Sequence, residues 1–128
     1  MTAGKRLFAL RGATRCKNDP EDITEQVGRL YDELLALNNL AEPDIVSILF
    51  SATADLDALN PAAGLRRYGR AEDASLFALQ EAAAQGGLER TVRTLIHCYL
   101  DEGAQVRHVY RNGAEVLRPD RCTTKTSS

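Results

Sequence analysis

The sequence is poor in the features on which several protein classes depend. It has three cysteines, Cys16, Cys98 and Cys122, with no C-x-x-C pair and no metal-ligand spacing to its two histidines. This odd, unpaired set argues against a disulfide framework and for a reducing compartment. No apolar run approaches the roughly 18 residues that a membrane span needs, and residues 1–12 lack the long apolar region of a secretory signal. We therefore expect a cytoplasmic protein without a metal site or a membrane segment.

The familiar catalytic and nucleotide-binding motifs are also missing. The sequence contains no G-x-G-x-x-G, no Walker A loop, no H-E-x-x-H and no nucleophile elbow. The cysteines have no evident activating neighbour. The net charge of −2 at pH 7 argues against non-specific nucleic-acid binding, because that binding depends on neutralising phosphates.

The composition otherwise predicts one soluble globular domain. The chain has 128 residues, of which 44% are hydrophobic and 27% charged, and about two-thirds of the unfolded surface can be buried at this length. We expect a single domain over residues 1–121 and a mobile polar tail over residues 122–128. Of the 16 basic residues, 13 are arginine. Arginine suits bidentate binding of carboxylate or phosphate, although a codon preference for arginine would give the same composition.

Local signals predict one long and one short helix. Asp19 is a suitable N-cap, acidic residues follow it, and apolar residues then recur at helical spacing until Asn38. A second, short helix is predicted to begin at Asn60-Pro61 and to run to about Tyr68, where Gly69 closes it.

Apolar runs and alternation predict the strands. These are residues 6–11, 45–51 and 75–79, with Gly12 ending the first. Residues 88–100 fit a helix or a strand, and their periodicity does not decide between the two. Asn112-Gly113, between residues 106–110 and 115–118, predicts a terminal β-hairpin. The fold class is therefore α+β, and because one long helix covers only one sheet face, a partner subunit is expected on the other.

The candidate functional residues are arginines near strands or turns and one acid in an apolar stretch. The arginines are Arg11, Arg66, Arg93, Arg107 and Arg118, and the acid is Glu81. An arginine that faces a sheet or a subunit cleft would bind an anion. The alternative is that each faces solvent, since arginine is rarely fully buried.

Several short motifs, in order along the chain, resemble the small trimeric chorismate mutases of the AroH class. They are RGAT at Arg11–Thr14, SATADL at Ser51–Leu56, QE at Gln80-Glu81, GGL at Gly86–Leu88, and RHVY with VLRPD across Arg107–Asp120. Each motif alone is weak, but the last pair is fairly specific and the ordered set spans most of the chain. The resemblance implies a mixed sheet with one long and one short helix, and a trimeric pseudo-α/β-barrel with active sites between subunits. It also favours a strand over residues 88–100.

The resemblance implies the Claisen rearrangement of chorismate to prephenate, on the route to phenylalanine and tyrosine, without cofactor or metal. This pericyclic reaction needs no nucleophile and no proton transfer, in keeping with the missing motifs. The enzyme instead restrains a flexible dianion and stabilises the negative charge that develops on its ether oxygen. By the resemblance, Arg93 is the cation at this oxygen and Glu81 accepts a hydrogen bond from the ring hydroxyl.

The resemblance also implies a set of substrate-binding residues. These are Arg11, Arg66, Phe77, Ala78, Tyr110, Leu117 and Arg118. Arg11 and Tyr110 match groups that hold the side-chain carboxylate, and Arg66 matches an arginine brought by the short helix of a neighbouring subunit. Leu117 and Arg118 match residues near the mouth of the cleft.

Four residues depart from the family pattern. Phe77 and Ala78 stand where threonine and cysteine are usual, and Asn60 and Ala63 stand where an aromatic residue and a lysine often flank the cleft. These departures leave open a non-catalytic anion-binding or regulatory trimer of the same fold. A trimeric imine deaminase of the Rid type is another alternative, against which the ordered motifs argue. Arg107 and His108 of the last motif are expected to be structural.

Overall fold

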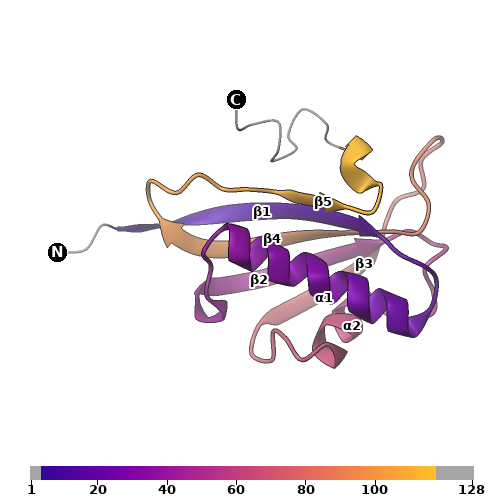
Figure 1. The fold of residues 1–128 in the computed structure, drawn as a ribbon, viewed down its shortest axis with the longest axis horizontal. Helices are drawn as coiled ribbons and strands as arrows, with labels where there is room; N and C mark the ends of the chain where they lie inside the picture. Colours follow the sequence, from indigo (N-terminus) through magenta and orange to yellow (C-terminus); the bar gives the residue numbers. More distant parts are fainter. Residues whose placement is uncertain (1–3, 118–128) are drawn as a thin grey trace.

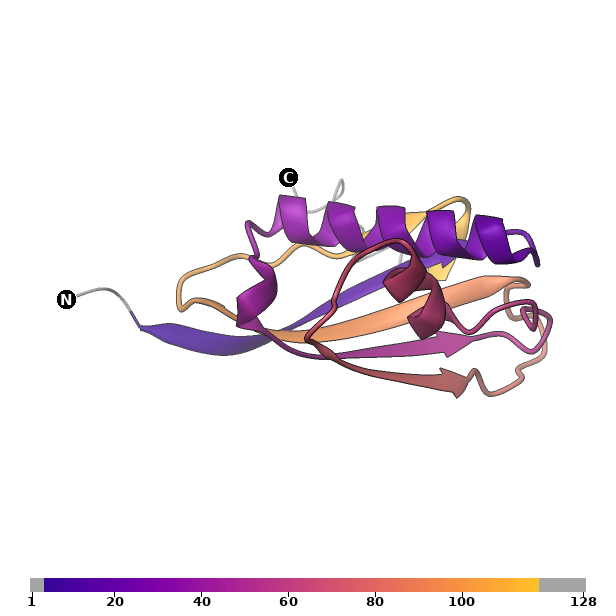
Figure 2. The same ribbon diagram turned by 90° about the horizontal axis from the view of Figure 1, so that it is seen from below.

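Five strands form one mixed sheet, and both α-helices lie on the same side of it (Figures 1 and 2). The computed structural model describes residues 4–117. Its elements are β1 (Lys5–Arg15), α1 (Pro20–Leu37), the 3₁₀ turn η1 (Glu42–Asp44), β2 (Ile45–Ala52), α2 (Pro61–Arg67), β3 (Ser75–Gln80), β4 (Thr91–Asp101), β5 (Val109–Arg111) and the 3₁₀ turn η2 (Ala114–Leu117). The predicted tail over residues 122–128 lies outside the described residues.

The strand order is β3-β2-β4-β1-β5. Strand β4 lies in the middle and runs antiparallel to both β1 and β2, whereas the outer pairs β2–β3 and β1–β5 are parallel. Parallel neighbours need a crossover connection, and α2 supplies the one between β2 and β3. The prediction of an α+β fold with a mixed sheet is confirmed.

Helix α1 forms where its sequence predicts it. Asp19 caps the helix by accepting a hydrogen bond from the backbone N–H of Asp22 at 3.0 Å, and Asn38 ends it. The apolar stripe is buried against the sheet: Ile23, Val27, Leu30, Tyr31 and Leu34 are all at most 2% exposed. Burial of this face, rather than helix propensity, is what stabilises such a helix.

Helix α2 also forms as predicted and packs against α1. The side chain of Asn60 accepts a hydrogen bond from the N–H of Ala62 at 2.8 Å, and Gly69 follows the helix with φ of +90°. The ring of Tyr68 lies so close to Gly28 of α1 that a Cβ there would be 2.2 Å from it. Asn60, one of the departures from the family pattern, is therefore a helix cap.

The prediction that Gly12 ends the first strand is wrong. Strand β1 continues through Gly12 to Arg15, paired along its length with β4. A Cβ at Gly12 would lie 2.9 Å from Leu34 and 3.1 Å from Leu30. The glycine is explained by the close approach of α1 to the strand rather than by a turn.

The predicted terminal hairpin is also wrong. Residues 109–111 form β5, which pairs in parallel with β1, and residues 114–117 form the turn η2. Asn112 and Gly113 do make the tight turn, with positive φ values of 57° and 95°. The amide of Asn112, however, donates to Thr14 Oγ1 and to Gln26 Oε1, both at 2.9 Å. These contacts anchor the turn to β1 and α1.

The strand alternative for residues 88–100 is confirmed, since β4 spans Thr91–Asp101. Its alternate residues are buried beneath the helices, while Arg93 and Tyr99 point to the other side. We call this other side the open face; neither α-helix covers it (Figure 2). Large apolar side chains are exposed on it: Leu7 (49%), Phe77 (60%), Leu79 (51%) and Tyr99 (43%). Neither helix within residues 4–117 has the length and apolar character to cross a bilayer.

Candidate active site

Three of the predicted site residues share the open face of neighbouring strands. Ala13 of β1 pairs with Arg93 of β4 on one side and with Tyr110 of β5 on the other. Residues that pair across strands point to the same face, as do residues two apart along one strand. Arg11 therefore lies on the same face as Arg93 and Tyr110, one step along β1. The fold brings together two cations and a phenol that are far apart in the sequence.

Glu81 joins this group from the end of β3. Its backbone N–H donates to the carbonyl of Ala52 at 2.8 Å, which extends the β2–β3 ladder by one residue. Its carboxylate forms an ion pair with Arg93, with 3.2 Å between Oε2 and Nε. The Glu81 side chain is 22% exposed and that of Arg93 is 49% exposed. The ion pair thus lies at the surface, where a ligand can reach it.

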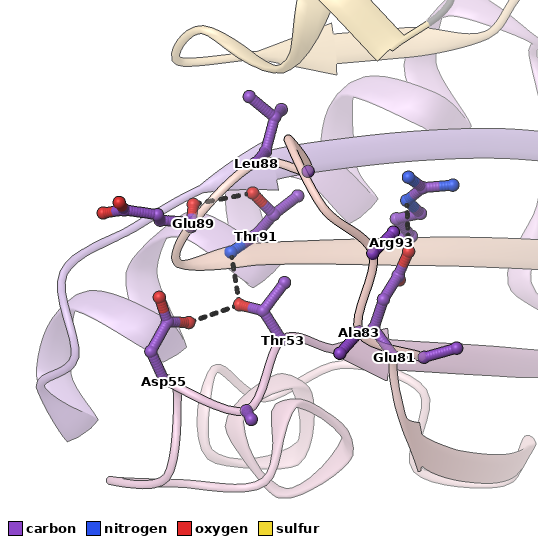
Figure 3. A pocket seen from close by; sticks show the side chains of 12 residues that line it. Thr53, Asp55, Glu81, Ala83, Leu88, Glu89, Thr91 and Arg93 are labelled. Atoms are coloured by element: carbon purple, nitrogen blue, oxygen red, sulfur yellow. Dashed lines mark hydrogen bonds and ion pairs between the residues drawn. The ribbon is translucent and has the colours of Figure 1, made fainter.

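The ion pair borders a pocket of about 300 Å³. The loop that follows β3 lines the pocket through residues 82–84 and 87–89, and Thr53, Asp55 and Thr91 line it as well (Figure 3). Figure 3 shows the terminal nitrogens of Arg93 directed away from the Glu81 carboxylate. The ion pair uses Nε, so the end of the guanidinium projects beyond it.

The charges around the ion pair decide on which side of it an anion binds. The pocket is lined by Asp55, Glu81 and Glu89 but by one cation, Arg93. A hydrogen bond from the Thr53 hydroxyl is the largest cause that lowers the pKa of Asp55, so this carboxylate stays charged at neutral pH. A dianion would be repelled from the Asp55 end and attracted towards Arg11 on the open face.

The other predicted binding residues are more scattered. The Arg66 guanidinium donates to the carbonyls of Glu72 (3.1 Å) and Ala74 (2.9 Å), so within one chain it braces the loop before β3. Phe77 is exposed on the open face, whereas Ala78 packs against the core on the helix side. Leu117 is half-buried at the end of η2. Arg118 lies outside the described residues.

Sequence reasoning assigned neither Ser51 nor His108 to the site, although each contacts a predicted site residue. Ser51 belongs to the quoted SATADL motif, and its hydroxyl donates to Oε1 of Glu81 at 2.7 Å. His108, expected to be structural, accepts a hydrogen bond through Nδ1 from the backbone N–H of Arg11 at 3.0 Å. The alternation of β2 places Ser51 on the same face as Leu49, but its neighbours depend on strand order, which no local pattern supplies.

Comparison with known proteins identifies the family. A family model described as chorismate mutase type I matches residues 7–121. The chain belongs to the type I chorismate mutase family. Among curated chorismate mutases of the AroH type, the protein from Bacillus subtilis (strain 168) is 33% identical over 123 residues, covering 94% of this chain and 97% of that protein. The protein from Thermus thermophilus is 32% identical over 114 residues, covering 87% and 93%.

A solved structure supports the same family. A chorismate mutase from Clostridium thermocellum superposes with a TM-score of 0.80 at 38% identity, covering 86% of this chain and 99% of that one. The resemblance inferred from the motifs is therefore confirmed, and so is the fold. Relatives named as chorismate mutases favour an enzyme over both the non-catalytic trimer and the imine deaminase. Residues 4–117 also contain no group of three or more His, Cys, Asp or Glu side chains placed to hold a metal ion.

Proposed function

We propose that this chorismate mutase converts chorismate to prephenate by conformational restriction and electrostatic stabilisation centred on Arg93 and Glu81. The reaction is the Claisen rearrangement on the route to phenylalanine and tyrosine. The observation that carries the assignment is the ion pair between Glu81 and Arg93 at the margin of the open face. It holds a cation and an anion side by side, and the transition state of the reaction likewise develops negative charge at one end and positive charge at the other.

The two residues act on opposite parts of that transition state. As the ether bond breaks, negative charge grows on oxygen, and the terminal nitrogens of Arg93 donate to it. Glu81 accepts a hydrogen bond from the ring hydroxyl and faces the positive end. One pre-aligned donor of this kind lowers a barrier by roughly 3–4 kcal/mol, or about 10²–10³ in rate. The proposed mechanism uses no cofactor or metal.

Substrate binding requires further hydrogen-bond donors. Arg11 and Tyr110 share the open face with Arg93, and we assign them to the side-chain carboxylate of chorismate. Such contacts hold the flexible dianion in its reactive conformation and so lower the entropic part of the activation barrier. Phe77, Leu117 and Arg118 complete the proposed cleft, and Ala78 contributes to it through its backbone, because its side chain packs on the helix side of the sheet.

One chain alone makes an incomplete site, which supports a trimer. The open face exposes Phe77, Leu79 and Tyr99, and large apolar side chains exposed on one face often mark an interface. Within its own chain Arg66 braces a loop; by the resemblance to the family, we propose that in the trimer it also reaches the cleft of a neighbouring copy. Three copies would bury the open faces together and form the active sites between them.

We place the enzyme in the cytoplasm, with no nucleic-acid or membrane partner. Cys16 and Cys98 are free thiols, which is usual in a reducing compartment. The net charge of −2 offers no excess of cations for phosphate backbones or anionic lipids.

The decisive experiment is turnover of chorismate, followed by the loss of its ultraviolet absorbance. Arg93→Ala is expected to lower kcat by about 10²–10³ while the assembly stays intact by light scattering. Arg29→Ala is the matched control, because Arg29 pairs with Glu25 on the outside of α1. A rate above about a tenth of wild type in Arg93→Ala would contradict the electrostatic assignment.

A further inference from the structure

We infer that Ser51 is a positioning residue that orients the Glu81 carboxylate for catalysis. The inference rests on the proposed role of Glu81. Ser51 Oγ lies 2.7 Å from Glu81 Oε1, while Arg93 Nε lies 3.2 Å from Oε2. A carboxylate is acceptor-only when ionised, so the serine hydroxyl is the donor in this contact. Each oxygen of Glu81 therefore has a different partner, and the plane of the carboxylate is fixed from both ends.

The sheet places Ser51 directly beneath the ion pair. In the β2–β4 register Ser51 is the cross-strand partner of Arg93, and in the β2–β3 register it is the partner of Leu79. All three side chains therefore share the open face. Glu81 follows Leu79 by two residues, and its backbone is tied to the residue after Ser51 through the Ala52 carbonyl. The hydroxyl and the carboxylate are thus held by the same two strands.

The small size of Ser51 is part of this arrangement. Cross-strand neighbours on one face lie about 4.5–5.5 Å apart at Cβ, so a long side chain at position 51 would compete with Arg93 for the space above β2. A serine fills the gap with a donor and leaves the guanidinium free to extend past the ion pair. Without the hydroxyl, Glu81 could rotate about its terminal bond, and the oxygen facing the substrate would no longer be defined.

The expected effect is on kcat rather than on KM. Glu81 faces the part of the substrate that becomes positive in the transition state, so its misorientation is felt mostly there. Ser51→Ala is expected to lower kcat about tenfold, the scale of one hydrogen bond to a charged group, with KM changed less than about threefold. Ser47→Ala is the matched control, because Ser47 lies on the same strand and face, with its hydroxyl 3.1 Å from Nδ1 of His97.

A second pair of variants separates the hydroxyl from the shape of the side chain. Ser51→Thr and Ser51→Val introduce nearly the same volume, but only threonine keeps the donor. The threonine variant is expected to recover at least half of the wild-type kcat, while the valine variant stays about tenfold lower. Equal rates in the two variants would overturn the inference, since shape alone would then explain the effect.

The closing experiment is a double-mutant cycle on the full-length enzyme. If Ser51 acts through Glu81, then Ser51→Ala changes kcat less than about twofold in a Glu81→Ala background. A tenfold loss that persists there would overturn the inference. Loss of activity in Glu81→Ala but none in Ser51→Ala would also overturn it and leave the proposed function intact. Wild-type activity in Glu81→Ala would instead overturn the proposed role of Glu81.

Discussion

The backbone N–H of Arg11 donates a hydrogen bond to Nδ1 of His108, 3.0 Å away. Strand β5 begins one residue later, where Val109 pairs with Gly12. The ring nitrogen thus accepts the hydrogen bond that a backbone carbonyl of a paired strand would accept, and the pairing of β5 with β1 starts at the next residue. Because Tyr110 lies on β5, this ring fixes the two proposed carboxylate-binding residues, Arg11 and Tyr110, relative to each other.

Removal of this ring is therefore expected to weaken substrate binding. His108→Ala deletes the acceptor, which contributes about 1 kcal/mol, and a KM increase of about fivefold with a small change in kcat follows from that loss. His108→Asn keeps an acceptor at a similar reach and is expected to restore most of the affinity. Hydrogen exchange at the Arg11 amide provides the structural readout. Equal exchange and equal KM in the two variants would show that the ring acts by packing alone.

Local signals account for most of the fold. Helix α1 was predictable because Asp19, the acidic first turn and the apolar stripe all act within a few residues of one another. The hairpin prediction failed because Val109 finds its partner in β1, far earlier in the chain. The tight turn at Asn112-Gly113 exists, but a turn signal says nothing about which strand the next segment will meet.

The site was predictable only in part, and for a related reason. Arg93 and Glu81 could be named from motifs that resemble a family. Their ion pair, and the hydroxyl of Ser51 beneath it, exist because β2 lies between β3 and β4. That strand order is a property of the whole sheet, so neither periodicity nor composition reveals it.

An active site shared between chains predicts complementation. In the proposed trimer Arg66→Ala removes a substrate contact supplied by a neighbouring copy, so this variant is expected to raise KM. When Arg66→Ala and Arg93→Ala chains are unfolded together and refolded, some clefts regain both natural residues. The mixture is then expected to exceed the summed kcat/KM of the two variants. Additive activity, with Arg66→Ala merely less stable, would restrict Arg66 to bracing the loop through Glu72 and Ala74.

The buried thiols are expected to be inert. Burial is the largest cause that raises the pKa of Cys16 and Cys98 from 9.0 to about 11. A shift of about two units leaves about a hundredfold less thiolate, the reactive form, at pH 8. In a Cys122→Ser background, both thiols should react with an aromatic disulfide only after denaturant is added. Rapid labelling of the native enzyme would contradict their burial.

A hydrogen bond between α1 and η1 makes stability depend on pH. The Tyr31 hydroxyl donates to Oε2 of Glu42 at 2.6 Å, and the backbone N–H of Ala71 donates to the same oxygen at 2.9 Å. The bond from Tyr31 is the largest cause that lowers the pKa of Glu42 below 4.5. A lowered pKa in the folded state means that the stabilisation is present above pH 4.5 and is lost as the pH falls through the folded-state value.

Tyr31→Phe removes the main cause of this shift. Because Glu42 is exposed to solvent, we expect a loss of only about 1 kcal/mol in the free energy of unfolding at pH 7. The difference from wild type should shrink in acid, once the pH has fallen below the folded-state pKa of Glu42 and its carboxylate is protonated in both proteins. Urea denaturation at one fixed protein concentration measures this, with Tyr68→Phe as the control for losing a phenol elsewhere. A deficit in Tyr31→Phe that is equally large at pH 7 and in acid would mean that the charge of Glu42 contributes nothing to the bond.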